Sequence, residues 1–421
     1  MKKRSSKKKA STLKTKILSS SKKNKMSVRK KIKKTVGKKS EHSTQGKHAP
    51  KKRVLKPVLK PVKLKFPHKR SGEIKPSLAK YKDNPIITPS KDRHWESVQT
   101  FNPAALFDDG MVHILYRALG NDGISVIGYA QSKDGIKIDS RSEKPVYACP
   151  LGRQKFSGPS YDPGNYTSGG GYGGCEDPRI TKIDDKVYMT YVSYDGWSAP
   201  RIALTSINIK DFLKQNWKWT KARIISPPGI VDKSGCLFPE KIKGKYVMLH
   251  RVFPDILVDF IDDLEFSDGN YLKGQHRIKV RNRRFWDSRK IGAGAPPIKT
   301  KYGWLLIYYG VDDKNASQYK IGAMLLDLDD PLKVLYRTDE PILEPDEWYE
   351  NEGHKAGVAY PCGAVVVDEH LLIYYGGADT VVCVAGAVLD DFLKDLMGGK
   401  KPSLKRANVS LKDHVARKTI R

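Results

Sequence analysis

The chain has 421 residues, which is enough for one large domain or two ordinary ones. Of its 78 basic and 46 acidic residues, 29 Lys or Arg but only Glu41 and Glu73 lie within residues 1–75. The remaining 49 basic and 44 acidic groups are nearly balanced. No apolar stretch is long enough for a transmembrane helix, and the charged N-terminus lacks the apolar segment of a signal peptide. These features predict a cytoplasmic globular protein with a polycationic arm.

The cysteine pattern agrees with that location. The number of cysteines is odd, and no two of them are closely spaced, so we expect reduced thiols rather than a disulfide framework. No CxxC or HxxxH spacing occurs, and we therefore predict no metal site. The cysteines are Cys149, Cys175, Cys236, Cys362 and Cys383.

In chain order, the first segment is an arm at 1–75 that is rich in Lys, Ser and Pro and almost lacks aromatic residues. Such a segment cannot bury enough apolar surface to offset its chain entropy, so it is predicted to be disordered. Its residues 54–61 are typical of an extended, polyproline-like linker. We predict a folded domain at 76–400 and a basic tail at 401–421.

The folded domain is predicted to consist mainly of short strands. The segments in question are rich in aromatic and branched residues and follow polar turns, as strands do. Helical periodicity is scarce, and the best helix candidate lies at 390–397. The predicted strands lie at 111–116, 186–191, 245–250, 304–309 and 370–375.

These strands belong to a repeated unit in which a Pro-containing segment precedes the strand. The separations between the marking prolines are 75, 61, 57 and 65 residues. Units of this length suit four-stranded propeller blades, and we predict an all-β, five-bladed β-propeller. A pair of β-sandwiches is the rival fold, and the regular spacing argues against it. The marking prolines are Pro103, Pro178, Pro239, Pro296 and Pro361.

The stretch Glu176-Asp177-Pro178-Arg179 follows a glycine-rich loop and precedes a strand-like segment. In a propeller, the start of each unit lies near the central axis, where ligands bind. Carboxylates beside cations suit a sugar that needs a proton donor and an anion such as phosphate. Asp177 alone could instead cap a turn, and single cations such as Lys290 could belong to ordinary solvated surface. The other charged residues of this constellation are Arg117, Lys233, Arg251 and Asp379.

Several motifs in order resemble glycoside hydrolase family 130, the β-mannoside phosphorylases and related β-mannosidases. The resemblance runs from about Asn84 to Leu396 and leaves the arm outside. It is specific because separate motifs agree along the chain. The motifs are EDPR at 176–179, LFPEKI at 237–242, MLHR at 248–251, KIGAGAPPI at 290–298, WLLIYYG at 304–310, EWYE at 347–350 and YYGGADT at 374–380.

The resemblance implies a five-bladed propeller and a hexosyl transfer. A β-mannoside is cleaved by inorganic phosphate, with inversion, to α-mannose 1-phosphate, and no further cofactor is needed. Asp177 then takes the place of the general acid. Lys233, Arg251 and Lys290 fall where the phosphorylases keep phosphate-binding cations. The residues implied to bind the sugar are Asn102, Arg117, Glu176 and Asp379.

One position departs from the family pattern. The phosphorylases usually carry Tyr-His-Gly where this chain has Tyr308-Tyr309-Gly310. Tyr309 can donate a hydrogen bond to phosphate but carries no positive charge near neutral pH. The alternative activity is an inverting β-mannosidase, which needs a carboxylate base for water. Because Lys233, Arg251 and Lys290 remain cationic, we favour the phosphorylase.

Two further alternatives stay open from the sequence. The domain could be a sugar-binding propeller without turnover. The arm could contact nucleic acid or another anionic surface through counterion release, or it could be a solubilising tail without a dedicated partner. A homo-oligomer is possible, and the acceptor sugar and linkage are left open.

Overall fold

The computed structural model describes residues 79–149, 171–267 and 269–398. They contain 21 β-strands and three short α-helices, so the predicted all-β class is confirmed. No helix in these three ranges is long and apolar enough to cross a bilayer. The predicted arm and linker, the tail at 401–421 and most of the loop at 151–174 lie outside the described residues.

The first part of the described chain forms an eight-stranded sheet in two antiparallel halves. A short parallel pairing of Ile124 with Gly173 and Ser125 with Gly174 joins the halves. The first half consists of β2 (Gln99–Asp108), β3 (Met111–Leu119), β4 (Ile124–Ser132) and β5 (Ser140–Arg141). The second half consists of β6 (Gly173–Ile183), β7 (Lys186–Tyr194), β8 (Arg201–Asn208) and β9 (Arg223–Ile224).

Two further antiparallel sheets follow in sequence. In the first of them successive strands pair, whereas in the second the first two short strands both pair with the third. The four-stranded sheet consists of β10 (Lys233–Leu237), β11 (Tyr246–Val252), β12 (Asp255–Ile261) and β13 (His276–Ile278). The five-stranded sheet consists of β14 (Lys290–Ala293), β15 (Ile298–Thr300), β16 (Gly303–Val311), β17 (Lys320–Leu326) and β18 (Val334–Arg337).

The last sheet joins the two ends of the described chain. The strand β1 (Ala79–Lys80) pairs with β21 (Val381–Val388) in the order β1-β21-β20-β19. The other two strands are β19 (Ala359–Val367) and β20 (His370–Gly377). The three α-helices are α1 (Ile209–Leu213), α2 (Trp348–Asn351) and α3 (Leu389–Met397), and a 3₁₀ helix, η1, spans His94–Glu96.

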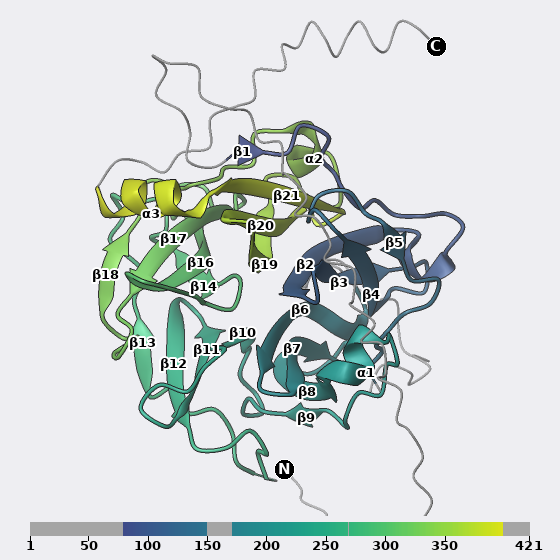
Figure 1. Cartoon of the computed structure of the whole chain (residues 1–421), viewed down its shortest axis with the longest axis horizontal. Coiled ribbons are helices and arrows are strands. Elements are labelled where there is room, and N and C mark those ends of the chain that lie inside the picture. Colours follow the sequence, from purple (N-terminus) through teal and green to yellow (C-terminus); the bar gives the residue numbers. More distant parts are fainter. Residues whose placement is uncertain (1–78, 150–170, 268, 399–421) are drawn as a thin grey trace, which may run out of the picture. The chain divides into compact units, whose positions relative to one another are not determined.

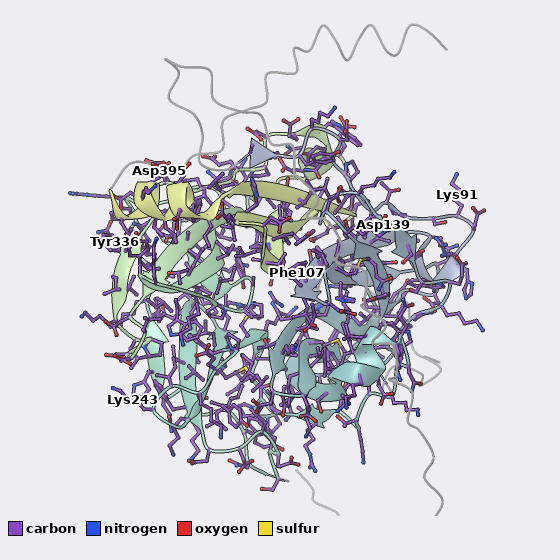
Figure 2. The ribbon with its side chains drawn as sticks, viewed as in Figure 1. Lys91, Phe107, Asp139, Lys243, Tyr336 and Asp395 are labelled. Carbon is purple, nitrogen blue, oxygen red and sulfur yellow. The ribbon has the colours of Figure 1, made fainter. Side chains whose placement is uncertain are left out.

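Successive groups of strands pack on one another through buried apolar side chains. In Figure 1 the groups follow one another as the colour changes from purple to yellow, and β19 and β20 contact β2. Figure 2 shows side chains filling the spaces between the groups. Residues that share a buried cluster across two groups include Leu115 with Val187, Ile202 with Met248, Val247 with Leu306, Leu305 with Ile373, and Ile114 with Leu372. The core therefore runs between the groups, and the last pair links β20 back to β3.

The predicted strands and helix are confirmed. The five predicted strands lie in β3, β7, β11, β16 and β20, and the helix predicted at 390–397 is α3. This helix buries Phe392, Leu393 and Leu396 against the cluster between β16 and β20. Polar turns such as the one at the exposed Lys243 lie at the outside, as Figure 2 shows.

The prolines mark the repeat only in part. Pro103 and Pro178 each lie in a bulge at the start of a unit's first strand, and Pro361 lies at the bulge of β19. A residue without an N–H fits where the ladder is interrupted. Pro239 and Pro296 lie beyond the ends of β10 and β14. At the bulge of β10 the register places Gly235 where β6 has Pro178. The prediction that all five prolines mark the same position of the repeated unit was therefore wrong.

A buried ionic triad links β11 and β12 to the residue that precedes β10. His250 of β11 lies 2.8 Å from Asp232 through Nδ1 and 3.4 Å from Asp259 through Nε2. Burial alone would lower the pKa of His250, but the two carboxylates outweigh it and raise that pKa to about 9. The imidazole is therefore charged at neutral pH and ion-paired on both sides.

This triad predicts a loss of stability at alkaline pH. Because the pKa of His250 is raised in the folded state, its contribution is complete below about pH 6.5 and disappears as pH rises through about 9. The shift corresponds to about 3 kcal/mol. Urea unfolding at pH 6 and pH 10 should show this extra loss in the wild type and not in His250→Gln. The exposed His94 supplies the control His94→Gln, which should keep the wild-type pH slope. An unchanged slope in His250→Gln would contradict the assignment.

Candidate active site

The predicted site residues gather at one end of the strand pairs. In an antiparallel pair, the start of one strand faces the end of the next. Phe101 thus pairs with Arg117, Lys233 with Arg251, and Gly292 with Tyr309. Hydrogen bonds and ion pairs between strands of different groups then bring these ends together.

The two carboxylates of β6 share one cation. Glu176 is fully buried and lies 3.2 Å from the Nη2 atom of Arg117 and 3.5 Å from the Nζ atom of Lys233. Asp177 lies 3.4 Å from the Nη1 atom of Arg117 and accepts a 2.7 Å hydrogen bond from Asn102. Residues from β2, β3, β6 and β10 therefore meet at this pair of carboxylates.

The backbone of β6 explains how neighbouring residues reach the same partner. Side chains of a regular strand alternate between its two faces. The register of β6 shifts between Glu176 and Arg179, and Asp177 is left-handed with φ of 51°. The bulge interrupts the alternation, so that Glu176 and Asp177 both contact Arg117. Asn102 occupies the matching bulge of β2, with φ of 48°.

Asp177 is held in its carboxylate form. Burial would raise its pKa, but the charges of Arg117, Arg179 and Lys233 outweigh burial, so the pKa is lowered. Arg179 does not reach the carboxylate directly. Its guanidinium donates to the main-chain oxygens of Asp177 and Gly294, which fixes the β6 bulge against the chain beyond β14.

Three cations, Lys233, Arg251 and Lys290, form the other part of the site, and Lys233 links them to Glu176. Burial lowers the pKa of Lys233, although Glu176 and Asp177 oppose this shift. Burial also lowers the pKa of Lys290 to about 7, and the charges of Arg251, Lys355 and Lys233 act in the same direction. The Nε atom of Arg251 is buried and has no hydrogen-bond partner among the described residues. Such a donor is available for an anion.

Tyr309 lies within a cluster of aromatic hydroxyls. Its hydroxyl is 3.1 Å from the Oγ atom of Ser234, which is also 3.2 Å from the hydroxyl of Tyr360. Its ring centroid lies 4.7 Å from that of Tyr360 and 5.9 Å from that of Tyr319. A Cβ at Gly292 would lie 2.3 Å from the Tyr309 hydroxyl, so only glycine leaves room for it.

Asp379 lies on the turn between β20 and β21. Burial raises its pKa, and Asp177 adds to the rise while Lys355 and Arg117 oppose it. The turn is held by Gln99, whose side chain donates to the main-chain oxygen of Asp379 at 2.5 Å. No described residue donates a hydrogen bond to the Asp379 carboxylate, which leaves its oxygens available to a ligand.

The sequence missed Ser234, Tyr319, Lys355 and Tyr360. A signal existed for two of them. Ser234 follows Lys233 as Asp177 follows Glu176, and it is left-handed with φ of 58° in the bulge of β10. Tyr360 directly precedes the marking proline Pro361. Tyr319 and Lys355 lie outside the repeated motifs and carry no comparable signal. No group of three or more His, Cys, Asp or Glu within the described ranges is arranged to hold a metal ion.

Comparisons with known proteins identify the family of the chain. A family model described as beta-1,4-mannooligosaccharide phosphorylase matches residues 74–397. The 1,2-beta-oligomannan phosphorylase of Thermoanaerobacter sp. (strain X514) is 41% identical over 319 residues, which is 73% of this chain and 96% of that protein. The beta-1,4-mannooligosaccharide phosphorylase of Ruminococcus albus is 30% identical over 335 residues, which is 76% of this chain and 91% of that protein.

A solved structure extends the similarity to the fold. The beta-1,2-mannobiose phosphorylase from Listeria innocua, in complex with beta-1,2-mannobiose, superposes with a TM-score of 0.59 at 27% identity. The superposition covers 76% of this chain and 99% of that one. The family predicted from the motifs is confirmed: the chain belongs to glycoside hydrolase family 130, the family of the β-mannoside phosphorylases and their relatives.

Proposed function

We propose that this protein is a glycoside phosphorylase that cleaves β-mannosides with inorganic phosphate and releases α-mannose 1-phosphate with inversion. The observation that carries the proposal is the juxtaposition of two carboxylates with Lys233, Arg251 and Lys290. The unpartnered buried donor of Arg251 supports the binding of an anion beside the sugar site. The relatives named as phosphorylases support the same reaction.

The reaction needs an oriented phosphate and a proton donor. A phosphate oxygen forms a bond to the anomeric carbon, the glycosidic bond breaks, and the leaving oxygen takes a proton. We assign the orientation of phosphate to Lys233, Arg251, Lys290 and the hydroxyl of Tyr309. Asp177 supplies the proton, directly or by relay. Asn102, Arg117 and Asp379 hold the sugar hydroxyls.

The lowered pKa of Asp177 requires a reason for its protonation. Arg117, Arg179 and Lys233 hold the free carboxylate in its charged form. A bound phosphate places negative charge among these cations and reduces their effect on Asp177. Phosphate binding therefore raises the affinity of Asp177 for the proton that the leaving group needs. Glu176, which we predicted to bind substrate, is paired with Arg117 and Lys233, and this pairing fits a role in placing both cations.

Hydrolysis is the second candidate and is less well supported. An inverting hydrolase needs a carboxylate base for the attacking water. The positions that would hold it carry Lys233, Arg251 and Lys290 in this chain, and Tyr309 faces Ser234 instead of a carboxylate. The hydroxyls of Tyr309 and Ser234 can both donate to a phosphate oxygen.

We propose β-1,2-linked mannosides as the preferred substrates. The support is the higher identity to the 1,2-beta-oligomannan phosphorylase, 41% against 30% for the β-1,4 enzyme. The proposed reaction transfers a hexosyl group to phosphate, so the protein would be classed as a hexosyltransferase with phosphate as acceptor.

We further propose that the fold is a five-bladed β-propeller. The two halves of the eight-stranded sheet would be two blades, and the other three sheets one blade each. The packing of β20 on β3 and the contacts of β19 with β2 support closure of such a ring. An experimental structure with a different number of strand groups around the axis would refute this.

We also propose that the arm contacts an anionic surface and that the protein is cytoplasmic. The cationic composition of residues 1–75 supports contact with nucleic acid or another anionic surface, and a solubilising tail is the alternative. The burial of all five cysteines is compatible with reduced thiols and a cytoplasmic location, which cell fractionation would test. Light scattering of the purified protein would test for a homo-oligomer.

The reaction type and the linkage can be tested together. With β-1,2-mannobiose as substrate, we expect release of α-mannose 1-phosphate only when inorganic phosphate is present, and slower turnover of β-1,4-mannobiose. Phosphate dependence and product identity can be measured by ³¹P NMR. Equal release of free mannose in phosphate-free buffer would establish the hydrolase instead.

Asp177→Asn tests the proton donor. The amide oxygen can still accept from Asn102, but the residue cannot deliver a proton, so kcat should fall by about 10²–10⁴-fold. Mannoside binding, measured by calorimetry, should persist. Asp184→Asn is the matched control, because Asp184 is an exposed turn residue with φ of 53° beyond the opposite end of β6. Full activity in Asp177→Asn would refute the role.

Deletion of residues 1–75 tests the arm. We expect the shortened protein to lose salt-sensitive retention on immobilised DNA while its rate of phosphorolysis stays unchanged, because the charges are lost but the site is not. Retention measured at several salt concentrations gives the number of counterions released. Unchanged retention would leave the solubilising tail as the better explanation.

A further inference from the structure

Lys355 is a cation of the site that neither the motifs nor the repeat identified. It lies between α2 and β19, on a segment fixed at two places. Its main-chain N–H donates to the oxygen of Ala378 at 2.9 Å, and that of His354 donates to the Oγ1 atom of Thr380 at 2.8 Å. The segment is therefore anchored to the turn that carries Asp379.

The side chain of Lys355 points toward the phosphate cations. Its Nζ atom lies 4.5 Å from the ring centroid of Tyr319, and the Nζ atom of Lys290 lies 4.5 Å from the same centroid. Lys290 also donates a 2.5 Å hydrogen bond to the Tyr319 hydroxyl. An aromatic ring attracts cations through its electron-rich face. Tyr319 therefore contacts both ammonium groups.

These cations have no neutralising partner in the part of the chain that the structure describes. Within the described ranges, Lys290, Arg251 and Lys355 form no ion pair with a carboxylate at up to 4 Å. Their mutual repulsion contributes, after burial, to the low pKa of Lys290. The charge of Lys355 opposes the rise in the pKa of Asp379, although the two groups form no ion pair within 4 Å. A bound anion would relieve this repulsion.

We propose that Lys355 is a fourth phosphate-binding cation, held by Tyr319 at the junction between the phosphate cations and the sugar-binding Asp379. This inference rests on the proposed phosphorylase function. The position next to Asp379 places the bound phosphate beside the sugar that it attacks. The competing assignment is that Lys355 contacts a sugar hydroxyl together with Asp379.

The test compares Lys355→Met, which keeps the length of the side chain but removes its charge, with Lys355→Arg. The control is Lys314→Met, on an exposed position of the loop between β16 and β17. Loss of one charge-assisted contact should raise the KM for phosphate by about tenfold to a hundredfold in Lys355→Met. The KM for β-1,2-mannobiose should stay within about twofold, Lys355→Arg should recover part of the loss, and Lys314→Met should behave as the wild type.

A binding measurement separates this proposal from the reaction. Titration of each variant with inorganic phosphate, followed by calorimetry, should show the same rise in Kd for Lys355→Met even if the wild type proves to be a hydrolase. Phosphate-independent turnover in the wild type would reject the phosphorylase function alone. An unchanged Kd and KM for phosphate, or a rise confined to the KM for the mannoside, would overturn the role of Lys355.

A pH profile with sulfate distinguishes direct charge from a structural role, because sulfate stays a dianion between about pH 5 and 9. The groups that face Lys290 are Lys233 of β10, Arg251 of β11, Tyr319 and Lys355, with Arg289 adjacent. In the wild type, sulfate affinity should fall as Lys290 loses its proton. Without the charge of Lys355, Lys290 keeps its proton to higher pH, so the midpoint of that fall should move upward. A midpoint that does not move would contradict the proposed proximity.

Discussion

The site depends on a bulge that recurs in β2, β6 and β10 and contains a residue with a left-handed backbone conformation. In β2, β6 and β10 it places Asn102, Asp177 and Ser234 at matching positions, each with a positive φ. Because the bulge interrupts the alternation of side chains, Glu176 and Asp177 both reach Arg117, while Asn102 binds Asp177 from a neighbouring strand. Without it, one of the two carboxylates would point away from the site.

The charges around this bulge are unequally neutralised. Glu176 forms ion pairs with Arg117 and Lys233 from a fully buried position, so these two cations have a carboxylate beside them. Lys290, Arg251 and Lys355 have no such partner within the described ranges. Positive charges thus lie close together where Arg251 and Lys290 are shielded from water, and this arrangement is unfavourable unless an anion binds. At Tyr309 the site has a cluster of neutral hydroxyls, whereas a further cation there would add to the repulsion.

Much of this could be predicted before the structure, and the failures have clear causes. The strands of β3, β7, β11, β16 and β20 were found because apolar and aromatic residues after polar turns are a local signal. The prediction that Pro239 and Pro296 are equivalent to the other marking prolines was wrong, because composition alone does not distinguish a bulge from a loop. Ser234 and Tyr360 were missed because they contact Tyr309 from other segments that are distant in sequence.

The sequence by itself determined the all-β class, the family, the cationic arm and the identity of the main charged residues, because each depends on local composition or on motifs in order. Only the tertiary structure decided which charges meet. It paired Glu176 with Arg117 and Lys233, left the Nε atom of Arg251 without a described partner and brought Lys355 beside Tyr319. The physical reason is that electrostatic interactions depend on distance and burial, and both are set by packing between strands that lie far apart in the chain.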